Sequence, residues 1–275
     1  MEQKLPQAVR LKLQKTLARF KDWIDINPAA TCPKPLQILG SGSNNYSVLV
    51  ANSHHYVIRI NRSPHHQNAL DPQAEIQALK AAAIHRIAPK LRFADSELGC
   101  IVCDYLEQKE APRARIDELA RLLRKIHALP AITQKVSLSD RIVHYQRLLR
   151  VAGSTDLKPP GTISARAALI GAQKLQSADE PRVLCHNDLL AANLIRNQGQ
   201  LWVIDWEYAA MGSRWFDLAV VCHGNLYDEE REGLLLSEYL RRDPAAQDWR
   251  MLRHARSAYA YLEWLWFASR DASSL

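Results

Sequence analysis

Residues 185–195 read Cys185-His186-Asn187-Asp188-Leu189-Leu190-Ala191-Ala192-Asn193-Leu194-Ile195, and after a predicted hairpin residues 203–207 read Val203-Ile204-Asp205-Trp206-Glu207. Three polar side chains, Asp188, Asn193 and Asp205, stand among apolar neighbours in this stretch. Phosphoryl transfer requires a carboxylate near the acceptor hydroxyl and oxygen ligands for a Mg²⁺ ion that bridges the phosphates. The stretch therefore predicts that Asp188 is the catalytic carboxylate and that Asn193 and Asp205 bind Mg²⁺. A turn residue, a helix cap and a strand end would explain each residue alone, but not the three together.

The spacing of these residues resembles the protein-kinase catalytic loop, in which an Asp precedes an Asn by five positions and a metal-binding Asp follows a short hairpin. Together with Phe216-Asp217-Leu218-Ala219, the sequence more closely resembles the aminoglycoside phosphotransferase and choline kinase superfamily. Ile204-Asp205-Trp206-Glu207-Tyr208 favours the branch of choline, ethanolamine and thiamine kinases. The resemblance implies that the γ-phosphate of ATP is transferred, with Mg²⁺, to an alcohol. It also implies that Asp217 braces the catalytic loop, and we expect His186 to be structural rather than catalytic.

A loop near the N-terminus carries a second part of the resemblance. The stretch from Leu39 to Val48, LGSGSNNYSV, resembles the superfamily's phosphate-covering loop, in which backbone N–H groups and small side chains approach the nucleotide. The protein-kinase pattern has a third glycine where Asn45 stands, and asparagine tolerates the left-handed backbone of such a turn. Four residues of this loop are expected to bind ATP, namely Gly40, Gly42, Ser43 and Asn45.

Arg59 lies in the strand-like run 56–60 and occupies the position of the strand Lys that pairs with nucleotide phosphates in kinases. Glu75, on a predicted helix over 72–84, is expected to orient Arg59. The alternatives are a strand-edge Arg59 in solvent and a Glu75 on the outer face of the helix. Asp104 and Leu106 belong to the stretch 103–106, which resembles the hinge whose backbone pairs with adenine. These four residues complete the predicted ATP site.

The acceptor side is indicated by aromatic residues near the C-terminus. Six of the seven Trp lie beyond residue 200, and aromatic faces hold a quaternary ammonium by cation–π attraction. Choline kinases resemble this region, so Trp264 and Trp266 are candidates for substrate contact, although helix-core positions explain them equally well. Glu207 and Glu263 are candidates to counter a cationic substrate. Choline or ethanolamine is the first expected substrate, thiamine the second, and a sugar or aminoglycoside the third.

The pattern of apolar residues predicts an α+β, two-lobed protein-kinase-like fold. Residues 1–106 should form a small nucleotide-binding lobe with strands over 36–39, 46–50, 56–60, 91–93 and 100–105, one helix over 72–84, and a preceding helix over 5–24. Residues 107–275 should form a larger, mainly helical catalytic and acceptor lobe with helices over 116–128, 140–152, 165–176, 229–241 and 246–269. Asp140 and Ser164 stand where helix N-caps are expected.

Composition narrows the class of protein further. The 275 residues are 47% hydrophobic and 24% charged, as in ordinary globular proteins. Five Cys without dense spacing favour reduced thiols, and the absence of long apolar runs argues against a membrane span or signal peptide, so a cytoplasmic protein is expected. The net charge of +7 favours anionic partners without choosing among them. We expect no nucleic-acid partner, but a degenerate kinase that binds RNA or an acidic protein is the competing class. Nothing in the sequence indicates the oligomeric state.

Overall fold

The computed structural model describes residues 5–41, 44–62, 71–108, 114–135, 137–153 and 159–272. The chain divides into two compact units. Unit 1 consists of residues 1–111 and 195–207, and unit 2 consists of residues 112–194 and 208–275. The segment 195–207 therefore belongs with the N-terminal unit, whereas the boundary expected at residue 106 assigns it to the C-terminal lobe.

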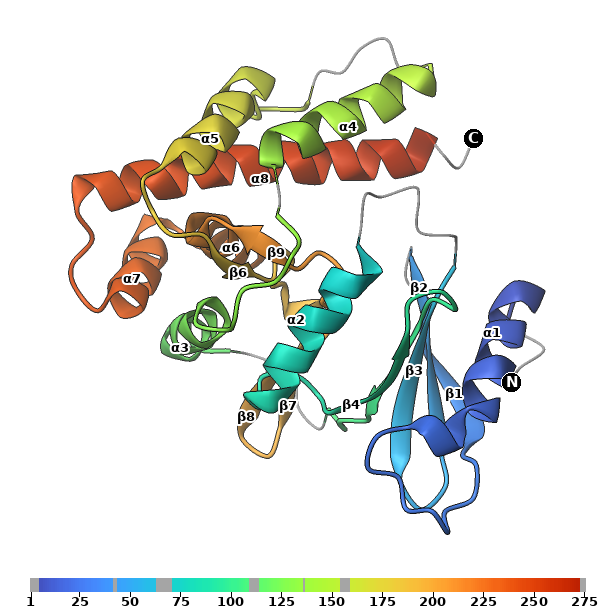
Figure 1. Ribbon diagram of the computed structural model, residues 1–275. Coiled ribbons are helices and arrows are strands. Elements are labelled where there is room, and N and C mark those ends of the chain that lie inside the picture. The colour runs from blue at the N-terminus through green and yellow to red at the C-terminus, as the bar shows by residue number, and fades with distance from the viewer. Residues whose placement is uncertain are drawn as a thin grey trace. The chain divides into compact units, whose positions relative to one another are not determined.

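Unit 1 is built on one antiparallel sheet with the strand order β1-β2-β3-β5-β4 (Figure 1). Its strands are β1 (Lys34–Ser41), β2 (Asn45–Ala51), β3 (His55–Asn61), β4 (Leu91–Asp95) and β5 (Cys100–Asp104). All five predicted strands are present. Side chains alternate between the two faces of a strand, so Ile58 and Ile60 of β3 point to one face and are fully buried, while Arg59 points to the other.

Helix α1 (Gln7–Ala18) and the short 3₁₀ helix η2 (Phe20–Asp22) cover the face of the sheet that carries Ile58. The helix expected over residues 5–24 is shorter than predicted because the chain turns after Ala18. The turn brings Phe20 and Trp23 into the core, where their rings pack edge to face with centroids 5.2 Å apart. Burial of two large aromatic side chains outweighs the continuation of a surface helix.

Helix α2 (Pro72–Ile84) lies on the opposite side of the sheet from α1 (Figure 1). Its start follows from the sequence, since the Asp71 side chain accepts a hydrogen bond from the N–H of Gln73 and Pro72 occupies the first turn. The hairpin of β7 (Leu194–Asn197) and β8 (Gln200–Val203) completes the unit. The N–H of Val203 donates to the carbonyl of Ile87, at 2.8 Å, which fixes the segment that leads to Asp205.

Unit 2 is mainly helical, as predicted. The long helix α8 packs against α4, α5 and α6, and Figure 1 shows α4 and α5 lying beside it. Strands β6 and β9 form a short antiparallel pair. The elements are α3 (Ile116–His127), α4 (Leu138–Val151), α5 (Ala165–Ser177), β6 (Val183–Cys185), the 3₁₀ helix η3 (Ala191–Asn193), β9 (Ala210–Gly212), α6 (Arg214–Gly224), α7 (Glu229–Leu240) and α8 (Ala246–Ala272).

Two details of unit 2 differ from the sequence prediction. Ser164 caps α5 as expected, but Asp140 does not cap α4, because Ser137 accepts the hydrogen bond from the N–H of Asp140 and the helix begins two residues earlier. Helix α6 was not predicted. Its residues from Trp215 to Cys222 are all buried, so the segment lacks the polar face by which an amphipathic helix is recognised.

Candidate active site

In unit 1, one guanidinium lies among three carboxylates. Arg59 contacts Asp205 Oδ1 at 2.9 Å and Glu207 Oε2 at 3.6 Å, and it forms a short ion pair with Glu75 from α2. Only 13% of the Arg59 side chain and 7% of the Glu75 side chain are exposed. The predicted pairing of Arg59 with Glu75 is confirmed, and neither residue lies in solvent.

The charges of this cluster do not balance. Burial, reinforced by the carboxylates of Asp205 and Glu207, raises the pKa of Glu75 to about 7 against the opposing effect of Arg59. Burial and the carboxylate of Asp205 likewise raise the pKa of Glu207. Burial is the larger cause of both shifts, and three carboxylates around one guanidinium leave an excess of negative charge when all of them are ionised. Such a site favours binding of a further cation.

Glu207 connects this cluster to the loop between β1 and β2. Its carboxylate accepts hydrogen bonds from Asn44 Nδ2 at 2.8 Å and from Asn45 Nδ2 at 2.7 Å. Glu207 and Asn45, expected at the substrate and at the nucleotide respectively, therefore contact each other. Gly40 lies at a register shift in β1, and a Cβ added there would meet no atom within 4 Å. Gly42 and Ser43, also expected to bind ATP, lie outside the described residues.

The predicted hinge residues follow β5. The carboxylate of Asp104 forms a two-pronged ion pair with Arg92 of β4, at 2.6 and 3.1 Å. Its backbone N–H donates to the carbonyl of Lys90. Leu106 is half-buried beyond the end of the strand. The binding of adenine at Asp104 and Leu106 stays a prediction.

In unit 2, the predicted catalytic loop follows β6 and is held by Asp217 of α6. The carboxylate of Asp217 is fully buried and accepts hydrogen bonds from the backbone N–H groups of His186, at 2.8 Å, and Asn187, at 2.7 Å. His127 of α3 lies 3.2 Å from the same carboxylate. The expectation that Asp217 braces the loop is confirmed. The left-handed backbone at Asn187, with φ of 63°, then turns the chain toward Asp188.

Asp188 and Asn193 contact each other within this loop. The side-chain amide nitrogen of Asn193 donates to the carbonyl and to Oδ2 of Asp188, both at 2.8 Å. This orientation leaves the amide oxygen of Asn193 available to a metal ion. In unit 1, the bond from Arg59 to Oδ1 of Asp205 leaves Oδ2 of that carboxylate for another ligand. Amide and carboxylate oxygens are the ligands that Mg²⁺ prefers, so the donor atoms present fit this ion.

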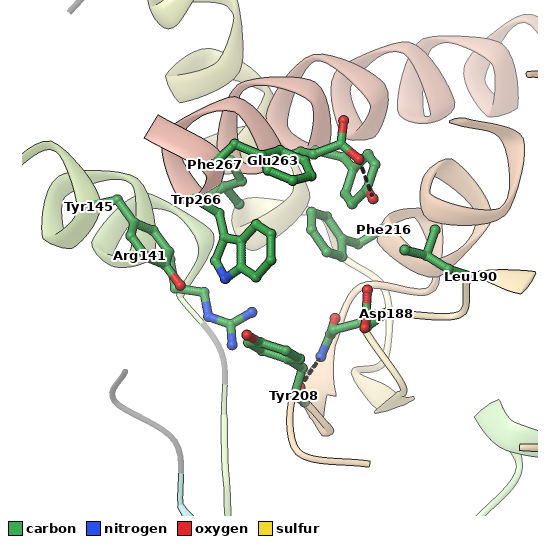
Figure 2. Close-up of a pocket in the computed structure, with 12 residues that line it drawn as sticks. Arg141, Tyr145, Asp188, Leu190, Tyr208, Phe216, Glu263, Trp266 and Phe267 are labelled. Atoms are coloured by element: carbon green, nitrogen blue, oxygen red, sulfur yellow. Dashed lines mark hydrogen bonds between the residues drawn. The ribbon is translucent and has the colours of Figure 1, made fainter. Parts of the chain in front are cut away.

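Unit 2 also contains a cavity of about 310 Å³ that Asp188 lines (Figure 2). This volume is at the lower end of the range for small-molecule sites, about 300–1,000 Å³. Most of the lining side chains are aromatic or apolar, and Figure 2 shows Trp266 and Phe216 over the centre and Tyr208 on the opposite side. The lining residues are Arg141, Tyr145, Asn187, Asp188, Leu190, Tyr208, Phe216, Tyr259, Leu262, Glu263, Trp266 and Phe267.

Of the predicted substrate residues, some line the cavity and others do not. Trp266 lines the cavity, whereas Trp264 stacks on Tyr261 with ring centroids 5.5 Å apart and does not line it. Glu263 lines it and is bonded to His223 at 2.9 Å and to the hydroxyl of Tyr259 at 3.0 Å. The hydrogen bond from His223 lowers the pKa of Glu263, so this residue holds a negative charge at neutral pH.

Nine of the twelve lining residues were not singled out from the sequence, and five of them have polar or aromatic side chains that bear on the site. Tyr208 belongs to the motif 204–208 and Phe216 to the motif 216–219, and Tyr259 stands four positions before Glu263 on α8. The sequence therefore contained a pattern from which these three could have been identified. Arg141 and Tyr145 lie on α4 at ordinary helical positions. Nothing in the sequence distinguishes them from other residues of an amphipathic helix.

Among the described residues, no helix combines the length and the apolar character needed to cross a lipid bilayer.

Comparison with known proteins finds a matching family model and related sequences. Residues 35–255 match the model of a family described as the phosphotransferase enzyme family. A thiamine kinase from Salmonella heidelberg is 27% identical over 248 residues, covering 86% of this chain and 83% of that protein. A LicA homolog from Mycoplasma capricolum is 28% identical over 142 residues, and the match covers 50% of this chain and only 57% of that protein.

Two solved structures have the same fold. The crystal structure of choline kinase LicA from Streptococcus pneumoniae superposes with a TM-score of 0.67 at 20% identity, covering 88% of this chain and 87% of that one. The structure of LicA in complex with AMP gives a TM-score of 0.70 at 18% identity, covering 98% and 92%. At these identities the likeness shows the fold, which confirms the kinase-like α+β architecture expected from the sequence.

Proposed function

Because the chain belongs to the phosphotransferase enzyme family and is a small-molecule kinase, we propose that it transfers the γ-phosphate of ATP to the hydroxyl of a small, positively charged alcohol. The observation that carries this proposal is the position of Asp188. This carboxylate lines a mostly aromatic cavity and is oriented by Asn193, in a loop that Asp217 holds. A carboxylate so placed is suited to receive the proton of a bound hydroxyl.

The reaction assigns a separate role to each group. The alcohol oxygen forms a bond to the γ-phosphorus, the bond from that phosphorus to the β,γ-bridging oxygen breaks, and ADP leaves while Asp188 takes the hydroxyl proton. Arg59 is proposed to contact the phosphates, and Glu75 to hold Arg59 in place. Asn193 and Asp205 are the proposed ligands of Mg²⁺, which when bound neutralises negative charge on the phosphates. The AMP complex of LicA supports a nucleotide site in a related fold.

Cavity size and charge support small alcohols as acceptors. A volume of about 310 Å³ suits choline, ethanolamine or thiamine better than an aminoglycoside. The aromatic rings and the charged Glu263 favour a cation in the cavity. The names of the thiamine kinase and choline kinase relatives are consistent with this class. Choline and ethanolamine are the first candidates, thiamine the second, and a sugar or aminoglycoside the third.

A coupled assay of ADP release tests the proposal. With Mg·ATP, at least one of choline, ethanolamine and thiamine should give ADP at a rate well above the rate without alcohol. Asp188→Asn should lower kcat by at least about 100-fold, the lower range for loss of a general base, while the thermal shift caused by ATP is retained. Unchanged kcat in this variant would remove Asp188 from the mechanism. No ADP release with any alcohol and no thermal shift with ATP would contradict the proposed function.

A further inference from the structure

Arg141 is a charged residue in the wall of the cavity, and the proposed reaction assigns it no role. It lies on α4 with its guanidinium carbon 5.2 Å from the centre of the Tyr208 ring. Figure 2 shows the guanidinium between the rings of Trp266 and Tyr208. The side chain is partly buried. Within the described part of the chain, this guanidinium has no acidic partner and no hydrogen-bond acceptor.

The other two charged groups of the cavity are already paired. Asp188 accepts the side-chain amide of Asn193, and Glu263 is bonded to His223 and Tyr259. Partial burial of a guanidinium without a counter-ion is unfavourable. An anion bound beside Arg141 would offset this free-energy cost. The planar fork of Arg matches the two oxygens of a carboxylate or phosphate, and an adjacent aromatic face leaves its N–H edge available for them.

Asn187 is a second polar residue in the wall of the cavity, and one of its side-chain atoms has no partner. This residue is 6% exposed and lines the cavity. Its side-chain nitrogen donates to the carbonyl of Tyr208 at 2.9 Å, whereas its side-chain oxygen is buried with no hydrogen-bond partner among the described residues. Buried acceptors without a partner are rare because each costs free energy.

We propose that the acceptor alcohol carries an oxyanion group, a carboxylate or a phosphate, and that Arg141 binds it. The substrate is then an alcohol with both charges, its cationic end among the aromatic rings near Glu263 and its anionic end at Arg141. This inference changes the order of candidates, since it ranks choline and ethanolamine behind alcohols that also carry an oxyanion. The inference rests on the proposed function, since it names the substrate class of the same cavity. Arg141 is in this view the residue that determines specificity, and it takes no part in the chemical step.

Matched pairs of alcohols that differ in one anionic group test this inference. The pairs are ethanolamine and L-serine, choline and L-carnitine, and glycerol and glycerol 3-phosphate, the last pair separating a phosphate from a carboxylate as the recognised group. Each is measured with wild-type enzyme and Mg·ATP for kcat/KM, and with Mg·ADP for thermal shift. The same measurements are made on Arg141→Met, which keeps an unbranched apolar side chain but removes the guanidinium, and on Arg147→Met, a control at an exposed position of the same helix.

For at least one pair, the wild-type enzyme should favour the anionic member by about 10- to 100-fold in kcat/KM, as expected for a charged hydrogen-bonded pair. Arg141→Met should reduce this ratio to about one, and Arg147→Met should retain it. The inference is overturned if no anionic member is preferred in either turnover or thermal shift, or if Arg141→Met leaves the preference unchanged. Turnover of choline or ethanolamine above that of their carboxylated partners would overturn it while the proposed function stands. Absence of ADP release from every alcohol would instead count against the proposed function, and the thermal shifts would still decide whether Arg141 binds an anion.

Discussion

At the scale of single residues, the contacts of Glu207 connect two parts of the predicted ATP site. Its carboxylate receives the side-chain amides of Asn44 and Asn45 and lies 3.6 Å from the guanidinium of Arg59. The loop that is expected to cover the phosphates is therefore held by a residue that follows the predicted metal ligand Asp205 by two positions. A change at Glu207 should act on the nucleotide rather than on the alcohol.

Glu207→Gln should raise the KM for ATP by about 10-fold, because an amide can accept only one of the two hydrogen bonds and a bond to a charged group contributes about 1.5–3 kcal/mol. The KM for the alcohol should change little. Combining Glu207→Gln with Asn45→Asp should recover part of the loss, since the Gln amide can donate to the new carboxylate. Steady-state kinetics with each substrate varied in turn measures these effects.

Glu97→Gln provides the matched control, because Glu97 is exposed in the same unit. It should leave both KM values at the wild-type level. If Glu207→Gln raises the KM for the alcohol instead, Glu207 acts at the acceptor, as the sequence alone suggested.

Residue types and spacing predicted the anchors of the site but not the direction of each side chain. Asp188, Glu263 and Trp266 were singled out from the sequence, and all three line the cavity. Glu207 was expected near the substrate, yet its carboxylate is bonded to Asn45 in unit 1. The left-handed backbone at Asp205, with φ of 63°, contributes to the direction of the chain there, and no motif specifies it. Arg141 was missed because its partner is a ring from a distant segment.

At the scale of helices and strands, the close approach of α5 and α8 depends on Gly171. A Cβ at this position would overlap the carbonyl oxygen of His254, which is backbone and cannot move without shifting α8. At Gly233 of α7, by contrast, an added Cβ would meet only the ring of Trp249 at 3.4 Å. The two helical glycines therefore differ in the space available for a side chain: Gly171 has no room for a methyl group, and Gly233 has.

Gly171→Ala should lower the free energy of unfolding by about 1–3 kcal/mol, the usual cost of overpacking. Gly233→Ala should leave it unchanged or raise it by up to about 1 kcal/mol, because alanine is the better helix former. Urea unfolding followed by circular dichroism compares the two. Equal stability of both variants would show that the α5–α8 contact adjusts freely.

The ion pair between His223 of α6 and Glu263 of α8 gives these two helices a dependence on pH. The hydrogen bond from His223 lowers the pKa of Glu263 below its usual 4.5, so the charged form stabilises the fold above that pH. The contribution is lost as the pH falls through the lowered value. The difference in Tm between the wild type and Glu263→Gln should therefore shrink as the pH is lowered from about 6 to about 3.

Thermal unfolding at several pH values measures this effect. Glu238→Gln, at an exposed position of α7, serves as the control and should follow the wild type throughout. A difference in Tm between the wild type and Glu263→Gln that is independent of pH would contradict the assignment.

Periodicity predicted most elements because most have one buried and one exposed face. Strand β3 shows the pattern directly, with Tyr56, Ile58 and Ile60 buried on one side. Helix α6 lacks it because eight consecutive residues, from Trp215 to Cys222, are buried, and β-branched residues within the run also suit a strand. The only polar member of that run is Asp217, which is satisfied by the loop it holds.

At the scale of the whole molecule, the five cysteine thiols differ in their exposure to solvent. Cys32 is exposed, Cys100, Cys185 and Cys222 are buried, and Cys103 is partly buried; all five are free thiols. Burial raises the pKa of Cys103 and of Cys222 to about 12. Thiols held in the protonated form and away from solvent react slowly.

The native protein should therefore expose one fast thiol per chain to Ellman's reagent near pH 8, and the unfolded protein should expose five. Cys32→Ser should abolish the fast phase and leave four thiols after unfolding. Two fast thiols in the native wild type would show that a cysteine other than Cys32 is accessible.

Unit 1 is assembled from two stretches of sequence, and this has a consequence for synthesis on the ribosome. The β-sheet and α2 emerge first, but residues 195–207 follow only after residues 112–194 have been made. In the nascent chain the ion pair of Arg59 with Glu75 can form early. The hydrogen bonds of Asn44 and Asn45 can form only after Glu207 has been synthesised. Since domains tend to fold as their residues leave the exit tunnel, unit 1 is completed only by a late segment, and a chain truncated before residue 207 would lack the carboxylate that accepts the side-chain amides of Asn44 and Asn45.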